Sequence, residues 1–94
     1  MKKYTAPEID AALDELPGWK LADGALEKNY TFGDFNEAFA FLTRTALYSD
    51  KVNHHAEYSG VYNKVRIRLY THDAGGITHK DTDFAKETDR YLSH

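Results

Sequence analysis

The hydrophobic pattern at the start of the chain has helical spacing. Thr5 can cap a helix, and Glu8 can complete a capping box three residues later. Apolar residues then recur three and four positions apart, and Pro17-Gly18 interrupts the pattern. These features predict a first helix between about residues 5 and 16.

Apolar and polar residues alternate in the next two segments. A short strand is expected around residues 19–21 and a longer one around residues 26–32, because a period of two places apolar side chains on one face of a sheet. Asp23-Gly24 lies between them, and both residues tolerate the positive φ of a two-residue turn. The sequence therefore predicts a β-hairpin here.

A long amphipathic segment follows, from about residue 34 to residue 53. Asp34 can cap this helix, with Glu37 as its capping-box partner. The apolar residues form two neighbouring stripes, which are Phe35, Ala38, Phe39, Leu42 and Ala46 in one and Phe41, Thr45, Tyr48 and Val52 in the other. A helix that is apolar over so wide an arc packs on more than one surface. We expect one surface to face the sheet and the other to face a second copy of the chain, in a homodimer or a homotetramer.

Alternation returns between residues 61 and 72, and it leaves two arrangements open, the second of which adds a strand at about residues 57–61. One is a single long strand, and the other is a hairpin that turns at Tyr62-Asn63. A last helix is expected after Thr78, with Asp81 as its capping-box partner. The order of elements predicts an α+β domain, in which three helices pack on one face of a four-stranded antiparallel sheet.

Composition narrows the class of protein. The 94 residues are expected to form a single domain, 1–94, and the absence of cysteine excludes thiolate nucleophiles and thiolate metal ligands. A net charge of −3 without a basic block disfavours direct nucleic-acid binding. No apolar run approaches the ~20 residues of a membrane span, and the N-terminus lacks the apolar segment of a signal peptide. We therefore expect a cytoplasmic protein with no membrane contact.

The candidate chemistry is concentrated between Asp50 and Asp81, which enclose four of the five histidines. Imidazole titrates near neutrality and can give or take a proton at little cost. The adjacent pair His54-His55 lacks the i, i+3 or i, i+4 spacing of helical metal ligands, so no metal site is expected. At the end of a helix both rings can turn toward one cleft; alternatively, the pair only caps the helix C-terminus.

The other candidates also have a purely structural alternative. His72 follows a strand at the start of a loop, where catalytic groups often lie, but exposed histidines at strand ends are common. Asp81 needs no role beyond helix capping. Trp19 is expected in the core, or as an aromatic wall for a flat ligand. His79 and His94 are expected to be exposed and without a role.

Taken together, these residues resemble the pterin-4a-carbinolamine dehydratase family. The matching positions are Asp50, His54-His55, Glu57, Tyr58, residues 61–65, Ile67, Leu69, Thr71-His72, Gly76-Ile77-Thr78 and Asp81, with Pro17-Gly18-Trp19, Phe32, Phe35 and Ala38 upstream. The family usually has glutamate, proline and tryptophan where this chain has Asp50, Ala56 and Tyr58. None of these differences removes a histidine.

The resemblance implies a substrate and a reaction. The substrate is a 4a-hydroxytetrahydropterin, which remains when an aromatic amino acid hydroxylase has used its cofactor, and the product is the quinonoid dihydropterin. The 4a-hydroxyl must gain a proton and N5 must lose one, and imidazoles can do both without a metal or another cofactor. The implied catalytic residues are His54, His55, His72 and Asp81, and the implied substrate contacts are Trp19, Glu57 and Tyr58.

The roles can be divided among these residues as an expectation. His54 and His72 are expected to transfer protons, His55 to position the substrate, and Asp81 to orient a histidine. The four side chains are expected to converge on one cleft, with Trp19 near its wall. The alternative function is a non-catalytic binding module, either a dimerisation partner of a homeodomain transcription factor or an assembly factor for a carboxylating enzyme.

Overall fold

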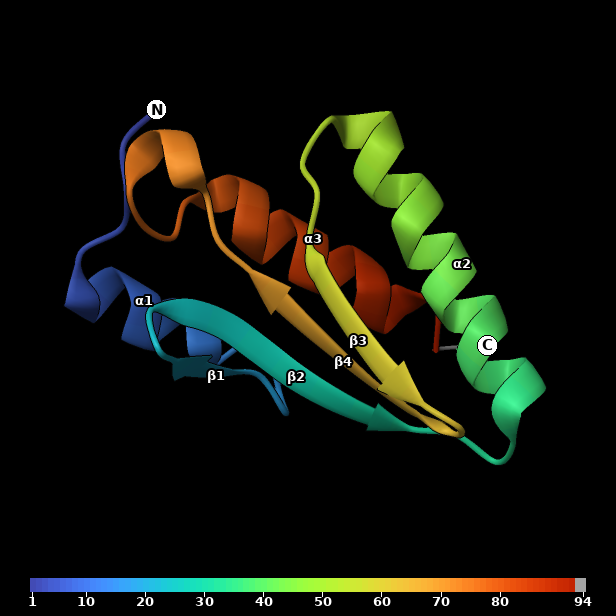
Figure 1. Cartoon of the computed structure of the whole chain (residues 1–94). Helices are drawn as coiled ribbons and strands as arrows, with labels where there is room; N and C mark the ends of the chain where they lie inside the picture. The colour runs from blue at the N-terminus through green and yellow to red at the C-terminus, as the bar shows by residue number, and fades with distance from the viewer. Residues whose placement is uncertain (93–94) are drawn as a thin grey trace.

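A computed structural model describes residues 1–92, so the expected exposure of His94 lies outside the described residues. Figure 1 shows strands and helices in the predicted order. The elements are α1 (Ala6–Leu13), β1 (Lys20–Ala22), β2 (Ala25–Thr31), α2 (Phe35–Val52), β3 (Glu57–Val61), β4 (Lys64–Leu69), the 3₁₀ helix η1 (His72–Ala74) and α3 (His79–Arg90). The three predicted N-caps, Thr5, Asp34 and Thr78, each accept a hydrogen bond from a backbone N–H of the first helical turn.

The four strands form one sheet in the order β1-β2-β4-β3, and every neighbouring pair is antiparallel. On one face β4 presents Val65, Ile67 and Leu69, which are buried and belong to the hydrophobic core. Phe41 of α2 and Phe84 of α3 pack into the same core, as do partly buried residues of α1. The predicted α+β fold, with its helices on the apolar face, is confirmed.

The opposite face of the sheet is polar because of the strand register. Lys20, Glu27, Arg68 and Glu57 are successive partners across β1, β2, β4 and β3. Opposite charges therefore alternate along a row that crosses the whole sheet. No helix in residues 1–92 covers this face, and the two ends of the row, Lys20 and Glu57, are exposed, whereas Glu27 is buried among its neighbours.

Both hairpin turns use a positive φ. Asp23 and Gly24 have φ values of 49° and 80°, as the predicted turn requires. Tyr62 has a φ of 52° and connects β3 to β4, so the hairpin is the correct alternative and the single long strand is wrong. As a result Val61 pairs with Lys64 on the polar face and is 72% exposed.

Helix α2 ends before the histidine pair. Its C-cap is Asn53 in the left-handed region, so His54-His55 lies in the connection to β3. The His54 N–H donates to the Ser49 carbonyl at 3.0 Å, so the predicted capping of the helix C-terminus is made by the backbone of His54. The buried residues Ala38, Phe41, Thr45 and Ser49 face the core, whereas Phe35 and Phe39 are 51% and 54% exposed. The first predicted stripe is therefore divided, because Ala38 packs in the core whereas Phe35 and Phe39 remain about half exposed within the described chain.

Candidate active site

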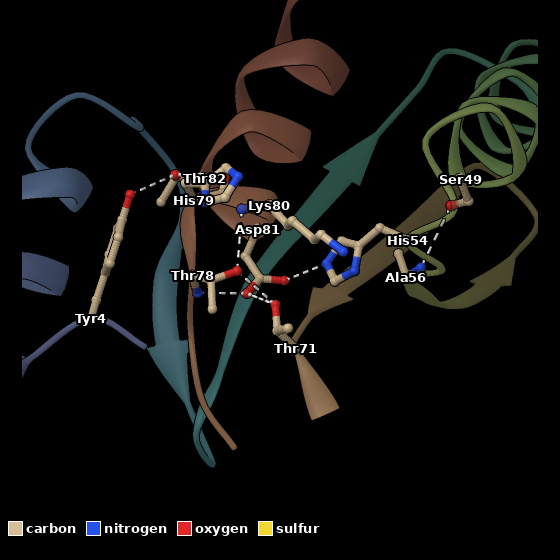
Figure 2. A network of polar contacts seen from close by, with 10 residues as sticks. All are labelled: Tyr4, Ser49, His54, Ala56, Thr71, Thr78, His79, Lys80, Asp81 and Thr82. Carbon is tan, nitrogen blue, oxygen red and sulfur yellow. Dashed lines mark hydrogen bonds and ion pairs between the residues drawn. The ribbon is translucent and has the colours of Figure 1, made fainter. Parts of the chain in front are cut away.

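A buried histidine and a buried carboxylate form the centre of the site. His54 Nε2 lies 2.6 Å from Asp81 Oδ1, and the two residues are 9% and 0% exposed. Figure 2 shows the His54 ring and the Asp81 carboxylate pointing toward each other. His54 comes from the connection after α2, and Asp81 comes from the first turn of α3, where the helix dipole favours a negative charge. Two segments 27 residues apart in the chain are thus joined by a short polar contact.

Asp81 also caps its own helix. Its Oδ2 accepts hydrogen bonds from the Thr78 N–H at 2.9 Å and from the Thr71 hydroxyl at 2.7 Å. The capping role predicted from the sequence is therefore confirmed, and it leaves the other carboxylate oxygen, Oδ1, for His54. Asp81 therefore caps α3 through Oδ2 and contacts His54 through Oδ1.

A cavity of 390 Å³ lies at one end of the polar sheet face. Its lining residues are His55, Glu57, Arg68, Tyr70, His72 and the turn residues Asp23, Gly24 and Ala25. Its volume falls within the ~300–1,000 Å³ of small-molecule sites. Two imidazoles and the exposed carboxylate of Glu57 thus border one space that a flat heterocycle could enter.

His55 and His72 are both exposed in this cavity but are held differently. The His55 side chain is 60% exposed, and its Nε2 lies 3.5 Å from an Asp50 carboxylate oxygen. The His72 ring packs edge-on against Tyr70, with ring centroids 5.0 Å apart. Tyr70 therefore restricts the orientation of His72, whereas His55 is restrained only by an exposed charge.

The floor of the cavity carries a fixed positive charge. Arg68 Nη1 lies 2.6 Å from Glu27 Oε1, and Arg68 Nε lies 3.7 Å from Glu57 Oε2. The hydrogen bond from Arg68 holds the pKa of Glu27 below its usual value of 4.5, and the same bond raises the pKa of Arg68. Glu57 is left with most of its carboxylate exposed and available to a ligand.

The remaining predicted substrate contacts lie in the core. Trp19 is 6% exposed, and its Nε1–H donates to Asp89 Oδ2 at 3.2 Å. The Tyr58 hydroxyl contacts the Ser49 hydroxyl and donates to the Thr45 carbonyl, and burial raises its pKa. Neither ring lines the cavity within one chain.

The structure thus divides the predicted site into two parts. His55, His72 and Glu57 border the cavity, whereas His54 and Asp81 form the buried pair. Sequence reasoning did not identify Arg68 and Tyr70 as cavity residues. The signal was present, because strand alternation places both on the same face as His72.

Among residues 1–92, no group of three or more His, Cys, Asp or Glu side chains is arranged to hold a metal ion. None of the helices described has both the length and the apolar character that crossing a bilayer requires. Metal independence itself stays a prediction.

Comparison with known proteins places this chain in a family. The model of the family described as pterin 4 alpha carbinolamine dehydratase matches residues 2–91. A protein of Rhizorhabdus wittichii is 53% identical over 88 residues, which are 92% of this chain and 91% of that protein. A protein of Sulfurisphaera tokodaii is 44% identical over 93 residues, which are 99% of this chain and 100% of that protein. Both relatives are named "putative pterin-4-alpha-carbinolamine dehydratase".

A solved structure has the same fold. The crystal structure of a Brucella melitensis protein, described as a transcriptional coactivator/pterin dehydratase, superposes with a TM-score of 0.91 and 35% sequence identity. The match covers 95% of this chain and 97% of that chain. With the family model matched over nearly its whole length, this chain belongs to the pterin 4 alpha carbinolamine dehydratase family.

Proposed function

We propose that this chain removes water from a 4a-hydroxytetrahydropterin and releases the quinonoid dihydropterin. The observation that carries the proposal is the buried His54–Asp81 pair, together with a cavity that is bordered by His72 and by His55, the residue after His54. Family membership and the names of the relatives support the same reaction.

The reaction consists of two proton movements and the breaking of one bond. The 4a-hydroxyl receives a proton and leaves as water, while N5 loses its proton and its electron pair forms the new double bond to C4a. No electrons are transferred to or from the protein. A base near N5 and an acid near the 4a-hydroxyl are therefore the groups that the protein has to supply.

We assign the base to His54 and the acid to His72. A carboxylate that holds one nitrogen of an imidazole fixes its tautomer and stabilises the charge that develops when the ring takes a proton. The His54–Asp81 pair has this arrangement, with a separation of 2.6 Å. His72 is exposed in the cavity and can exchange its proton with water between turnovers. His55 and Glu57, at the same cavity, position the ring of the substrate.

The test is an assay of dehydration. A 4a-hydroxytetrahydropterin is generated in solution, and its loss is followed by ultraviolet absorbance with and without the protein. The proposal expects a rate above the uncatalysed one, unchanged by a chelator because no step assigned here uses a metal. A rate equal to the uncatalysed one would refute it, and zinc lost together with activity would refute the metal-free mechanism.

We also propose that copies of the chain associate through α2. Phe35 and Phe39 stack on each other with centroids 5.6 Å apart and remain about half exposed, and Leu47 is 67% exposed. Exposed apolar residues concentrated on one helix are typical of an interface. A homodimer or homotetramer is expected in light scattering at micromolar concentration, and Phe39→Glu is expected to shift it toward the monomer. A wild-type monomer would contradict this proposal.

A second candidate function is binding to another protein. The Brucella melitensis relative is described as a transcriptional coactivator as well as a pterin dehydratase. The exposed α2 surface could serve such a role when copies of the chain do not cover it. The dehydration assay distinguishes the two candidates. An enzyme would raise the rate above the uncatalysed one, whereas a binding module without catalysis would leave that rate unchanged.

A further inference from the structure

Thr71 is connected to both histidines of the proposed proton transfer. Its hydroxyl belongs to the buried network of His54 and Asp81, and its backbone begins the loop that carries His72. Thr71 is 5% exposed, so its contacts are shielded from water. None of the roles assigned above uses this residue.

The direction of each hydrogen bond in this network follows from the protons that each group carries. The Thr71 hydroxyl donates to Asp81 Oδ2, as does the Thr78 N–H. Because the Thr71 proton is used in this bond, the Thr78 hydroxyl donates to Thr71 Oγ1, 2.9 Å away. The Lys80 N–H donates in turn to Thr78 Oγ1 at 3.2 Å. Each hydroxyl therefore has one orientation (Figure 2).

This arrangement decides which nitrogen of His54 carries the proton. An ionised carboxylate only accepts hydrogen bonds, so the Nε2 atom facing Asp81 Oδ1 is the protonated one. Nδ1 is then the lone-pair nitrogen of the neutral ring. Among residues 1–92, no group forms a hydrogen bond with Nδ1 of His54. Every fully buried side-chain nitrogen or oxygen in these residues does have a hydrogen-bond partner, so Nδ1 is not fully buried. Nδ1 therefore reaches the molecular surface, where it can accept a proton.

The backbone of Thr71 holds the other half of the site. Its carbonyl accepts hydrogen bonds from the N–H groups of Ala74 at 3.2 Å and Gly75 at 3.0 Å, and its own N–H donates to the Gly76 carbonyl at 3.1 Å. These bonds close the loop around η1 and fix the residue that follows Thr71, which is His72. The position of His72 is thus tied to the same residue that contacts Asp81.

We propose that Thr71 is a positioning residue that orders the base and the acid together. Its hydroxyl orients Asp81, which holds His54 as the Nε2–H tautomer with Nδ1 free to accept the proton. The effect on rate rests on the proposed function, whereas the tautomer does not depend on it. Loss of the hydroxyl leaves Asp81 with one donor fewer and Thr78 without its acceptor, so the carboxylate can rotate.

The tautomer is measured in the wild-type protein by long-range ¹H–¹⁵N correlation NMR at alkaline pH, where imidazoles are neutral. His54→Gln removes one set of ring signals and so assigns it. The Nε2–H form is expected, and a wild-type His54 protonated on Nδ1 would overturn the proposal. This measurement needs no Thr71 variant to fold.

Thr71→Val then tests the role in catalysis. It is expected to show both His54 tautomers and to lower kcat roughly tenfold with little change in KM, a size typical of residues that act through a catalytic group. Thr71→Ser is expected to restore both readouts. The control is Thr45→Val, since Thr45 is 0% exposed and its hydroxyl donates only to the Leu42 carbonyl. A Thr71→Val protein with the wild-type tautomer and the wild-type kcat would overturn the proposed role of Thr71. A wild-type protein without dehydratase activity would refute the proposed function and leave the tautomer of His54 unaffected.

Discussion

The buried pair and the open cavity offer two different surroundings for the same kind of side chain. His54 is 9% exposed and lies 2.6 Å from a fully buried carboxylate. His55, the next residue, has a side chain that is 60% exposed and lies 3.5 Å from an exposed carboxylate. The contact of His54 is short and buried, whereas the contact of His55 is longer and lies between two exposed side chains. The comparison indicates that the fold holds the proposed base, His54, in one place, whereas His55 is restrained only by an exposed charge.

The largest expected effect comes from removing a proton-transfer group on either side of this comparison. His54→Ala and His72→Ala are each expected to lower the dehydration rate by roughly 10²–10⁴-fold, the usual range for one acid or base. The rate is measured by ultraviolet absorbance at saturating substrate. His79→Ala is the control, because His79 is exposed at the start of α3 and has no assigned role. A control as slow as the other two would break the assignment.

The next effect concerns the buried His54–Asp81 pair and the free energy of unfolding. Asp81→Ala leaves the Nε2–H of His54, the hydroxyl of Thr71 and the N–H of Thr78 without their acceptor in a buried site. The free energy of unfolding is expected to fall by about 3 kcal/mol, as it does when one partner of a buried pair is removed. Chemical denaturation measures this change.

Asp83→Ala is the matched control for that measurement, since Asp83 is an exposed carboxylate on the same helix. It is expected to change the free energy of unfolding by less than about 0.5 kcal/mol. If Asp81→Ala were as mild as the control, the network would not stabilise the fold.

A smaller effect on the kinetics is expected from a change at the open cavity. His55→Ala removes an exposed ring that we propose positions the substrate, so KM is expected to rise by about 3- to 10-fold, equivalent to one ordinary hydrogen bond. Because His55 is not assigned a proton, kcat should change less than it does in His54→Ala. Steady-state kinetics of the two variants measure the difference directly. A kcat that falls equally in both would mean that the two neighbours share one role.

The smallest effect concerns the ion pair beneath the cavity. The folded-state pKa of Glu27 lies below 4.5 because Arg68 donates to its carboxylate. The stabilisation is therefore present above about pH 4.5 and is lost as the pH falls through the folded pKa. Glu27→Gln lacks this titration, so its free energy of unfolding should fall less steeply than that of the wild type below pH 4.5. Equal slopes in acid denaturation would show that the Arg68–Glu27 pair does not stabilise the fold.

The sequence determined the elements of this protein and the face that each buries. Alternation in the strands, the capping boxes at Thr5 and Thr78, and the Asp23-Gly24 turn are local features, because each depends on residues within a few positions of one another. Local features of this kind can be read without knowing the fold. The helical pattern of α2 likewise indicated more apolar surface than one sheet covers.

Local patterns could not decide between the two arrangements for residues 57–72. The alternation is the same for one long strand and for a hairpin. The choice depends on the left-handed conformation of Tyr62, which is stabilised when β3 and β4 pair. Sheet pairing therefore resolved what the sequence left open.

Tertiary structure alone separated the two neighbouring histidines. In the sequence, His54 and His55 have the same side chain and lie next to each other. His54 became the buried one because the chain leaves α2 after Asn53 and brings that ring to Asp81, 27 residues later, while His55 turns to the cavity at the open face of the sheet. A contact over that distance depends on how α3 docks on the sheet, and no short segment of the sequence contains that information.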